Sequence, residues 1–290
     1  MKKLQIPTVD DINILNQMCS NTGVASRPYI NNEHHIMHDK YIEYLNNNGN
    51  PWLCMGKVIS TNLTDKLKYH YKKPFQLLNY INELRSKGSP DVCPFCGSSK
   101  TATLDHYLPQ ADYPEWVIFS KNLVPACDCN SKRRNDVKGN NNNQRVFHPY
   151  YDDCLTLRLV SASFRGNMDE PEIDFLPISN QTIPDETIMF HIDTVLKRST
   201  AINWMSSKWQ SMRRKPRCVI STIPRGNIVL TMQDLESYLL QCQEDKDDEH
   251  KTPNNWYSMF ITGIINSTQA KQWLLDRQNG ITQGTISPLD

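Results

Sequence analysis

Two pairs of closely spaced cysteines place the strongest constraint on how this chain can fold. Cys93-Pro-Phe-Cys96 is a common half of a zinc site, since a two-residue spacer lets both sulfurs turn onto one ion. Cys127-Asp-Cys129 has a one-residue spacer, so the backbone must kink before both sulfurs can reach the same ion. We expect all four thiolates to hold a structural Zn²⁺. The alternative is a set of buried thiols without a metal.

Residues of a different chemical kind lie between and beside these pairs, namely Asp105, His106, Asn122 and Asn130. Carboxylate and amide oxygens are ligands for a hard cation such as Mg²⁺, and a neutral imidazole beside the cation can take a proton from water. Neighbouring residues on a strand point to opposite faces, so Asp105 and His106 can serve one site only where the strand ends or bends. The sequence therefore predicts one metal that holds the fold and a second that supports chemistry.

This stretch resembles the HNH endonucleases, the ββα-metal nucleases, over residues 90–150. In that family a strand ends in an Asp-His or His-His pair, a loop pinned by an asparagine follows, and a helix brings a further His or Asn to the metal. Leu104-Asp-His-Tyr-Leu-Pro109 is most similar to the HNH nucleases of bacterial anti-phage defence systems.

The resemblance implies a role for each polar residue. His106 would be the general base, Asp105 and Asn130 would bind a catalytic Mg²⁺ or Mn²⁺, and Asn122 would hold the loop that presents His106. It further implies a metal-dependent endonuclease that hydrolyses phosphodiester bonds of double-stranded DNA, with an ATPase or sensor subunit as its partner. Two alternatives stay open. The same site could act on RNA, for example tRNA, and a zinc knuckle could bind nucleic acid or protein without catalysis.

Basic residues follow Asn130 directly. Lys132, Arg133 and Arg134 would neutralise phosphate charge beside the site, although a charge run is also typical of a solvated helix face. A second basic cluster at 213–217 has Trp204 and Trp209 nearby, which favour either nucleic-acid contact or a buried core.

Three histidines outside this group are further candidate ligands. His148 could reach the active site or serve a structural purpose. His34 and His38 have the spacing of a helical metal clip, but without an evident third ligand we expect them on the surface.

Composition narrows the class of protein. The 32 Lys and Arg residues against 31 Asp and Glu residues exclude a protein that coats nucleic acid by bulk charge, but a nuclease needs only a local basic cleft. No apolar run is long enough to span a membrane, and the first residues lack the apolar segment of a secretory signal. Nine cysteines, four of them in metal-type spacing, favour a reducing cytoplasm.

The periodicity predicts an α+β protein with a helical region at 1–90 and a mixed, mostly helical region at 151–290. The resemblance implies an HNH core at 91–150, on which the first region packs. The core should run as knuckle, strand, loop, strand and helix. A charged break is expected at 244–251, and the tail after Gln278 is expected to be disordered. Expected helices are 9–21, 38–48, 72–87, 191–212, 232–243 and a broken pair over 256–275, and expected strands are 155–164, 171–178 and 217–223.

Overall fold

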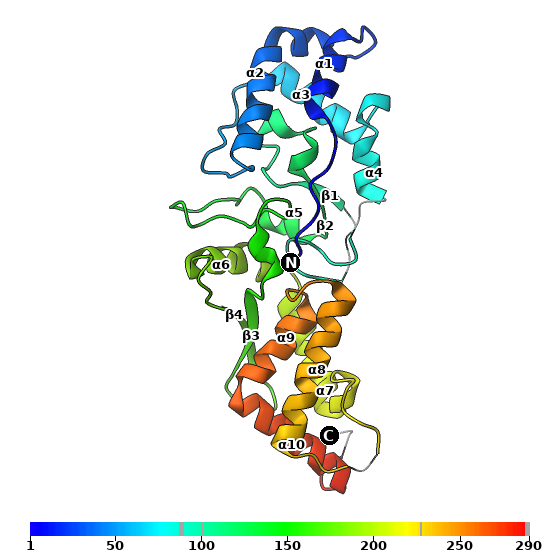
Figure 1. Ribbon diagram of the computed structural model, residues 1–290, viewed down its shortest axis with the longest axis vertical. Helices are drawn as coiled ribbons and strands as arrows, with labels where there is room; N and C mark the ends of the chain where they lie inside the picture. Colours follow the sequence, from blue (N-terminus) through cyan, green and yellow to red (C-terminus); the bar gives the residue numbers. More distant parts are fainter. Residues whose placement is uncertain (87–89, 100, 102, 227, 288–290) are drawn as a thin grey trace. The chain divides into compact units, whose positions relative to one another are not determined.

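The computed structural model describes residues 1–86, 90–99, 101, 103–226 and 228–287 (Figure 1). Within these residues the chain is a mixed α/β protein in which helices predominate and the strands form two separate antiparallel pairs. The chain divides into two compact units, one mainly of residues 3–153 and the other mainly of residues 154–290. The mixed fold class predicted from the sequence is confirmed, while an HNH core as such stays a prediction.

The N-terminal unit begins with helices whose starts are encoded locally. The Asp10 carboxylate accepts a hydrogen bond from the Asn13 N–H at 3.0 Å, and the Ser60 hydroxyl caps the third helix in the same way. Pro28 lies in the first turn of the second helix, where its missing N–H costs nothing. The elements are α1 (Asp11–Ser20), α2 (Arg27–Asn46), α3 (Thr61–Lys72), η1 (Gln76–Leu78) and α4 (Tyr80–Ser86).

Two helix predictions in this unit need correction. The single helix expected over 72–87 is wrong, because α3 ends at Lys72 and α4 begins only at Tyr80. Pro74 lies between them, and a proline disfavours helical conformation in the residue before it. The end predicted at Gly88 lies outside the described residues. The helix expected over 38–48 is part of a longer one that begins at Arg27.

The segment that follows has the predicted order of knuckle, strand, loop, strand and helix. Strands β1 (Thr103–His106) and β2 (Leu123–Ala126) pair antiparallel, with His106 opposite Leu123. The loop between them contains the short turns η2 (Pro114–Trp116) and η3 (Ser120–Asn122). Helix α5 (Cys129–Arg133) is short, because Arg134 after it adopts a positive φ of 60° that an α-helix cannot continue.

The C-terminal unit packs a β-hairpin against helices. Strand β3 (Val160–Arg165) pairs with β4 (Glu172–Pro177), and α9 (Trp256–Asn266) packs against both β3 and α8 (Met232–His250). No helix among the described residues is both long enough and apolar enough to span a bilayer. The remaining elements are η4 (Asp153–Thr156), α6 (Asp185–His191), η5 (Ile192–Leu196), α7 (Ala201–Arg214), η6 (Pro216–Cys218) and α10 (Thr268–Gln283).

Several predictions for this unit are corrected. The strand expected over 217–223 is wrong, because η6 and turns between Pro216 and Pro224 occupy this segment. Helix α8 starts at its predicted cap, Thr231, but runs through the expected charged break to His250. Helix α10 continues to Gln283, beyond the point at which the chain was expected to lose order.

Helix α9 approaches β3 so closely that only a glycine fits at position 263. A Cβ atom added there would lie 2.5 Å from the carbonyl oxygen of Ala162. Alanine normally stabilises a helix relative to glycine, but here we expect Gly263→Ala to lower the free energy of unfolding by about 1–3 kcal/mol. Urea denaturation would measure this change.

Gly280→Ala in α10 is the matched control for this substitution. Its added Cβ would meet the flexible end of the Ile286 side chain at 2.5 Å, and that side chain can move. Equal losses of stability in the two variants would contradict the explanation by backbone approach.

Candidate functional site

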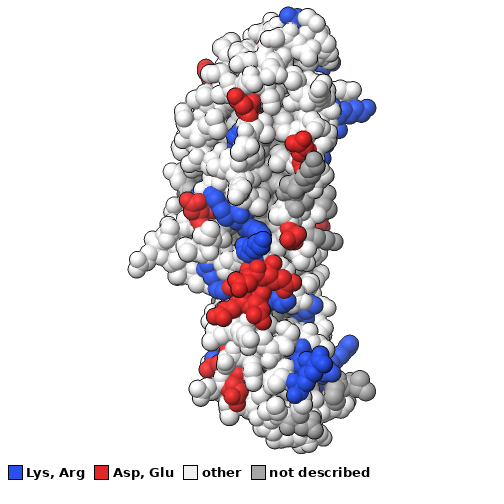
Figure 2. All heavy atoms as spheres, turned by 45° about the vertical axis from the view of Figure 1, so that its right-hand side comes forward, with Lys and Arg blue, Asp and Glu red and all other residues white. Residues whose placement is uncertain are grey.

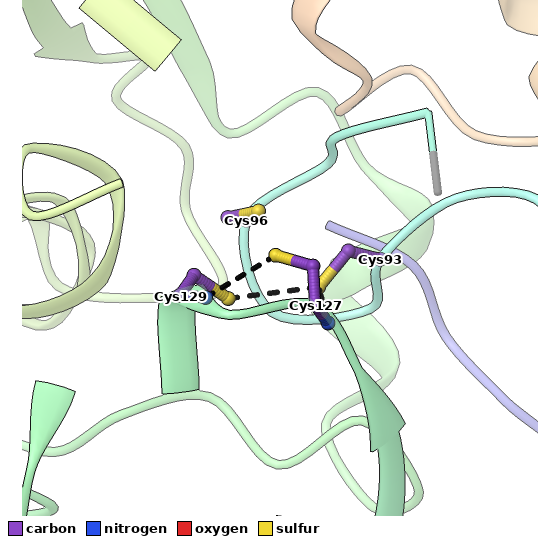
Figure 3. Close-up of side chains that lie close together, drawn as sticks. All are labelled: Cys93, Cys96, Cys127 and Cys129. Carbon is purple, nitrogen blue, oxygen red and sulfur yellow. Dashed lines mark hydrogen bonds between the residues drawn. The ribbon is translucent and has the colours of Figure 1, made fainter. Parts of the chain in front are cut away.

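A buried cluster of four cysteines lies beside the ββα segment, the name used here for β1, β2 and α5 with the loops between them. Figure 3 shows the side chains of Cys93 and Cys96 from one loop facing those of Cys127 and Cys129, which come from the end of β2 and the start of α5. All four sulfurs lie within 4.8 Å of one another, and all four side chains are buried. The one-residue spacer between Cys127 and Cys129 therefore does not keep either sulfur out of the cluster.

The donor set fits a tetrahedral zinc ion. Zinc–sulfur bonds of about 2.3 Å place the ligand sulfurs about 3.8 Å apart, and the Cys93 and Cys129 sulfurs are 3.6 Å apart. Backbone N–H groups also point at the sulfurs: that of Cys127 donates to Cys93 Sγ at 3.4 Å, and that of Cys129 donates to Cys127 Sγ at 3.3 Å. Such bonds stabilise thiolates, so the cluster can bind a metal such as zinc.

The end of β1 brings Asp105 and His106 to one place. His106 is buried and its backbone N–H donates to Asp105 Oδ1 at 2.7 Å, which bends the carboxylate back toward its neighbour. The Asp105 side chain is 32% exposed, so it stays open to solvent. The strand ends at His106, and the alternation expected for adjacent residues does not separate the two side chains.

Hydrogen bonding determines which imidazole nitrogen of His106 is basic. Nε2 lies 2.9 Å from the carbonyl oxygen of Val117, and because a carbonyl can only accept, Nε2 carries the proton. Nδ1 therefore keeps its lone pair, and it lies 3.9 Å from Asp105 Oδ1. Burial lowers the pKa of His106, while the bond to Val117 and the charge of Asp105 oppose this effect. The neutral ring is the form that can accept a proton.

Asn122 closes the loop that carries Val117. Its Oδ1 accepts from the Leu108 N–H at 2.8 Å, and its Nδ2 donates to the carbonyl oxygens of Leu108 and Trp116, each at 3.1 Å. One buried amide thus ties the two ends of the loop together and fixes the carbonyl that orients His106. Asn122 therefore bonds to the backbone at both ends of this loop.

The N-terminal helices hold the same loop from outside. The Tyr44 hydroxyl of α2 donates to Asn122 Oδ1 at 3.2 Å, and the Tyr80 hydroxyl of α4 donates to the Ile118 carbonyl. The Asp11 carboxylate of α1 accepts from the Ser120 N–H at 2.8 Å and pairs with Lys121 at 2.7 Å. Helices α1, α2 and α4 therefore pack on the loop between β1 and β2 through specific polar contacts.

A buried arginine of α5, Arg133, holds the side chain of Asn130 by a hydrogen bond. Arg133 Nε donates to Asn130 Oδ1 at 2.9 Å, and Arg133 Nη2 donates to the carbonyl oxygens of His106 and Tyr107 at 3.2 and 3.0 Å. Only 1% of Arg133 is exposed. The burial of Arg133 rules out the alternative of a solvated helix face for this residue, and its contact with phosphate stays a prediction. The contacts seen here join α5 to the end of β1.

These side chains line a hollow of about 290 Å³. The lining residues are Asp105, His106, Asn130, Arg133 and Arg134, together with Pro109, Gln110, Ala111, Ser131 and Asn135. Arg134 is exposed at this hollow and lies outside the helix that was expected to carry it. Lys132 is absent from the lining residues and pairs with Asp128 at 2.8 Å.

His148 is placed away from this hollow, in the buried network behind it. Its Nε2 lies 2.9 Å from the Tyr44 hydroxyl, and its Nδ1 accepts from the Tyr150 N–H at 3.1 Å. Burial, together with the charges of Arg145 and Lys3, holds the pKa of His148 well below its usual value. These contacts are those of the structural histidine that was weighed as the alternative. His34 bonds to Asn16 Oδ1 at 2.8 Å.

Sequence reasoning missed Tyr44 and the bridging contacts of Arg133. Tyr44 lies 78 and 104 residues from the two side chains that it joins, Asn122 and His148, so no local pattern could have indicated it. Arg133 follows Asn130 by three residues, which places both on one face of a helix. That spacing was a usable signal for the bond between the two side chains.

These features define a mixed α/β protein with a buried four-cysteine cluster and, in its ββα segment, a polar hollow that contains an Asp, a His and an Asn. A stretch of 104 residues, 35% of this chain, is 38% identical to "Protein ea31" of Escherichia phage lambda. The matched stretch makes up 32% of that protein, so the chain spans about a third of the length of this relative. No family model matches the chain, and no solved structure matches it.

Proposed function

We propose that this protein is a metal-dependent nuclease of the HNH type that acts on DNA. The observation that carries the proposal is the hollow in which Asp105, His106 and Asn130 meet. Three further features support it: a loop tied by Asn122, an imidazole whose basic nitrogen is defined, and a four-cysteine cluster beside the same segment.

The residues present fit a hard divalent cation. The Asp105 carboxylate is half-buried and supplies anionic oxygen, and Asn130 Oδ1 retains a lone pair beyond the one used by Arg133. These two side chains would hold the ion. When bound, Mg²⁺ or Mn²⁺ would supply charge stabilisation for the phosphate and the leaving oxygen.

His106 would perform the proton transfer. Its Nδ1 takes a proton from a water molecule, the water oxygen forms a bond to phosphorus, and the bond from phosphorus to the 3′ oxygen breaks. The Val117 carbonyl holds the other ring nitrogen as a donor and so keeps the ring oriented. Arg134, exposed at the rim, would contact a neighbouring phosphate. As the effector of an anti-phage system, such an enzyme would act with an ATPase or sensor subunit.

Substitution of the proposed metal ligand tests this function. We expect Asp105→Asn to raise the Mn²⁺ concentration needed for half-maximal nicking of supercoiled plasmid by about tenfold or more, because an anionic ligand becomes neutral. Total RNA assayed in parallel distinguishes a ribonuclease from a deoxyribonuclease. Asp128→Asn is the matched control, since Asp128 is exposed on the same segment, pairs with Lys132 and does not line the hollow.

Two results would count against the proposal. One is an Asp105→Asn protein whose metal dependence equals that of the wild type. The other is a folded, zinc-loaded wild type that cleaves neither DNA nor RNA with either metal, alone or with its neighbour-encoded partner.

A further inference from the structure

One part of the C-terminal unit is strongly basic in a chain whose net charge is only +1. Residues 194–233 include eight lysines and arginines and no aspartate or glutamate. Figure 2 shows a group of basic side chains gathered toward the lower end of that view. The charge is thus concentrated in one segment, from α7 through η6 to the start of α8.

The basic segment forms one wall of a hollow in the C-terminal unit. This hollow has a volume of about 290 Å³. Its polar lining residues are Lys215 and Arg217 at η6, Arg225 in the turn that follows, and Gln278 and Thr282 of α10. Three cationic groups and two neutral hydrogen-bonding side chains therefore face the same space. Together they are the donor types that contact phosphate oxygens.

The three cations of this hollow have no counter-ion among the residues that the structure describes. Within the described residues no aspartate or glutamate forms an ion pair with Lys215, Arg217 or Arg225. Arg217 Nε donates to the Ile223 carbonyl at 3.0 Å, which anchors that side chain and leaves its terminal nitrogens for another acceptor. Like charges gathered without a partner repel one another, so the hollow favours an anion.

The nearby tryptophan belongs to the core. Trp209 is 1% exposed, donates to the Met168 carbonyl at 2.8 Å, and stacks on Trp273 with ring centroids 4.8 Å apart. Its ring is therefore closed to an unstacked base. The residues that line the hollow include no aromatic side chain, so recognition there rests on charge and hydrogen bonds, which contact the backbone and do not distinguish base sequences.

We propose that this basic hollow, lined by Lys215, Arg217 and Arg225, is a second nucleic-acid contact that binds backbone phosphates. Arg214 is exposed at the end of α7 immediately before the hollow, so the cations extend beyond a single anion site toward a neighbouring phosphate. A linear polyanion matches this arrangement. The site shares no residue with the hollow at Asp105 and His106, so its binding can be measured without any cleavage.

The test measures binding by the full-length His106→Ala protein to a fluorescent 30-base-pair duplex over a range of salt concentrations. Adding Lys215→Gln and Arg225→Gln should weaken binding by about tenfold or more at low salt. It should also reduce the slope of log K against log salt by about 2, because two phosphate contacts are lost. Both side chains are exposed.

The matched control is Arg165→Gln with Lys251→Gln, which removes the same charge from exposed positions of the same unit outside the hollow. This control should retain the affinity and salt slope of its parent. Equal weakening in both double variants would overturn the proposal in favour of bulk charge. A second result would also overturn the proposal: the Lys215→Gln and Arg225→Gln variant keeps its affinity for DNA but no longer binds vesicles that contain phosphatidylserine. That result would assign the surface to anionic lipid.

Discussion

His106→Ala should lower the rate of metal-dependent DNA cleavage by about 10²–10⁴-fold, the contribution of a positioned general base. The substitution removes Nδ1, the nitrogen left unprotonated by the bond from Nε2 to Val117. It leaves Asp105 and Asn130 in place, so nucleic-acid binding should persist. Single-turnover cleavage of supercoiled plasmid and anisotropy with a labelled duplex would measure the two properties separately.

A second buried histidine of the same unit provides the control for this experiment. His70 in α3 is buried, bonds to Ser26 Oγ at 2.9 Å and does not line the hollow. His70→Ala should therefore create a similar cavity and a similar loss of thermal stability with little loss of rate. A His106→Ala protein that cleaves within about threefold of the wild type would remove His106 from the role of general base.

Loss of a cluster cysteine is the second large effect that we expect. Cys93→Ser or Cys129→Ser removes one of four thiolates from a closed set, and the zinc content should fall from about one ion per chain toward zero. Because zinc binding to such a site contributes about 10–16 kcal/mol in small zinc domains, the ββα segment should lose its cooperative unfolding. Elemental analysis after dialysis and thermal unfolding would report these two changes.

Cys54→Ser provides the matched control for the metal site. Cys54 is also buried in the N-terminal unit, but it lies outside the cluster, and burial raises the pKa of its thiol to about 12. It is therefore a protonated side chain without a ligand's chemistry, and its substitution should leave the zinc content unchanged. A wild type that purifies without metal and melts cooperatively would contradict the structural zinc.

The local features of the ββα segment could be predicted from the sequence. Cysteine spacing predicted the cluster, and the resemblance carried by the Asp-His pair and the asparagines implied the order of strand, loop, strand and helix. These features depend on residues close together in the chain. Thr231 likewise identified the start of α8, because a capping box is a local hydrogen-bond pattern.

Other features depended on contacts between distant residues or on competing local effects. Pro74 interrupts a hydrophobic pattern that otherwise reads as a single helix over 72–87. The acids of 244–249 look like a break in the sequence, but α8 continues through them, and one of them, Asp247, pairs with the distant Arg158. Arg133 belongs to a basic run, yet it is buried because three oxygen acceptors surround it.

The hydroxyl of Tyr44 makes the ββα segment a poor candidate for transplantation. A fragment of residues 91–153 would keep Asn122 and His148 but would lose the Tyr44 hydroxyl, which contacts both. It would also uncover the faces of Phe119 and Trp116 that pack on the Tyr44 ring, at centroid distances of 5.0 and 5.5 Å. A transplanted version of this segment must therefore include α2. In a chimaera that exchanges only the residues between the two cysteine pairs, the loop between β1 and β2 should be held less tightly.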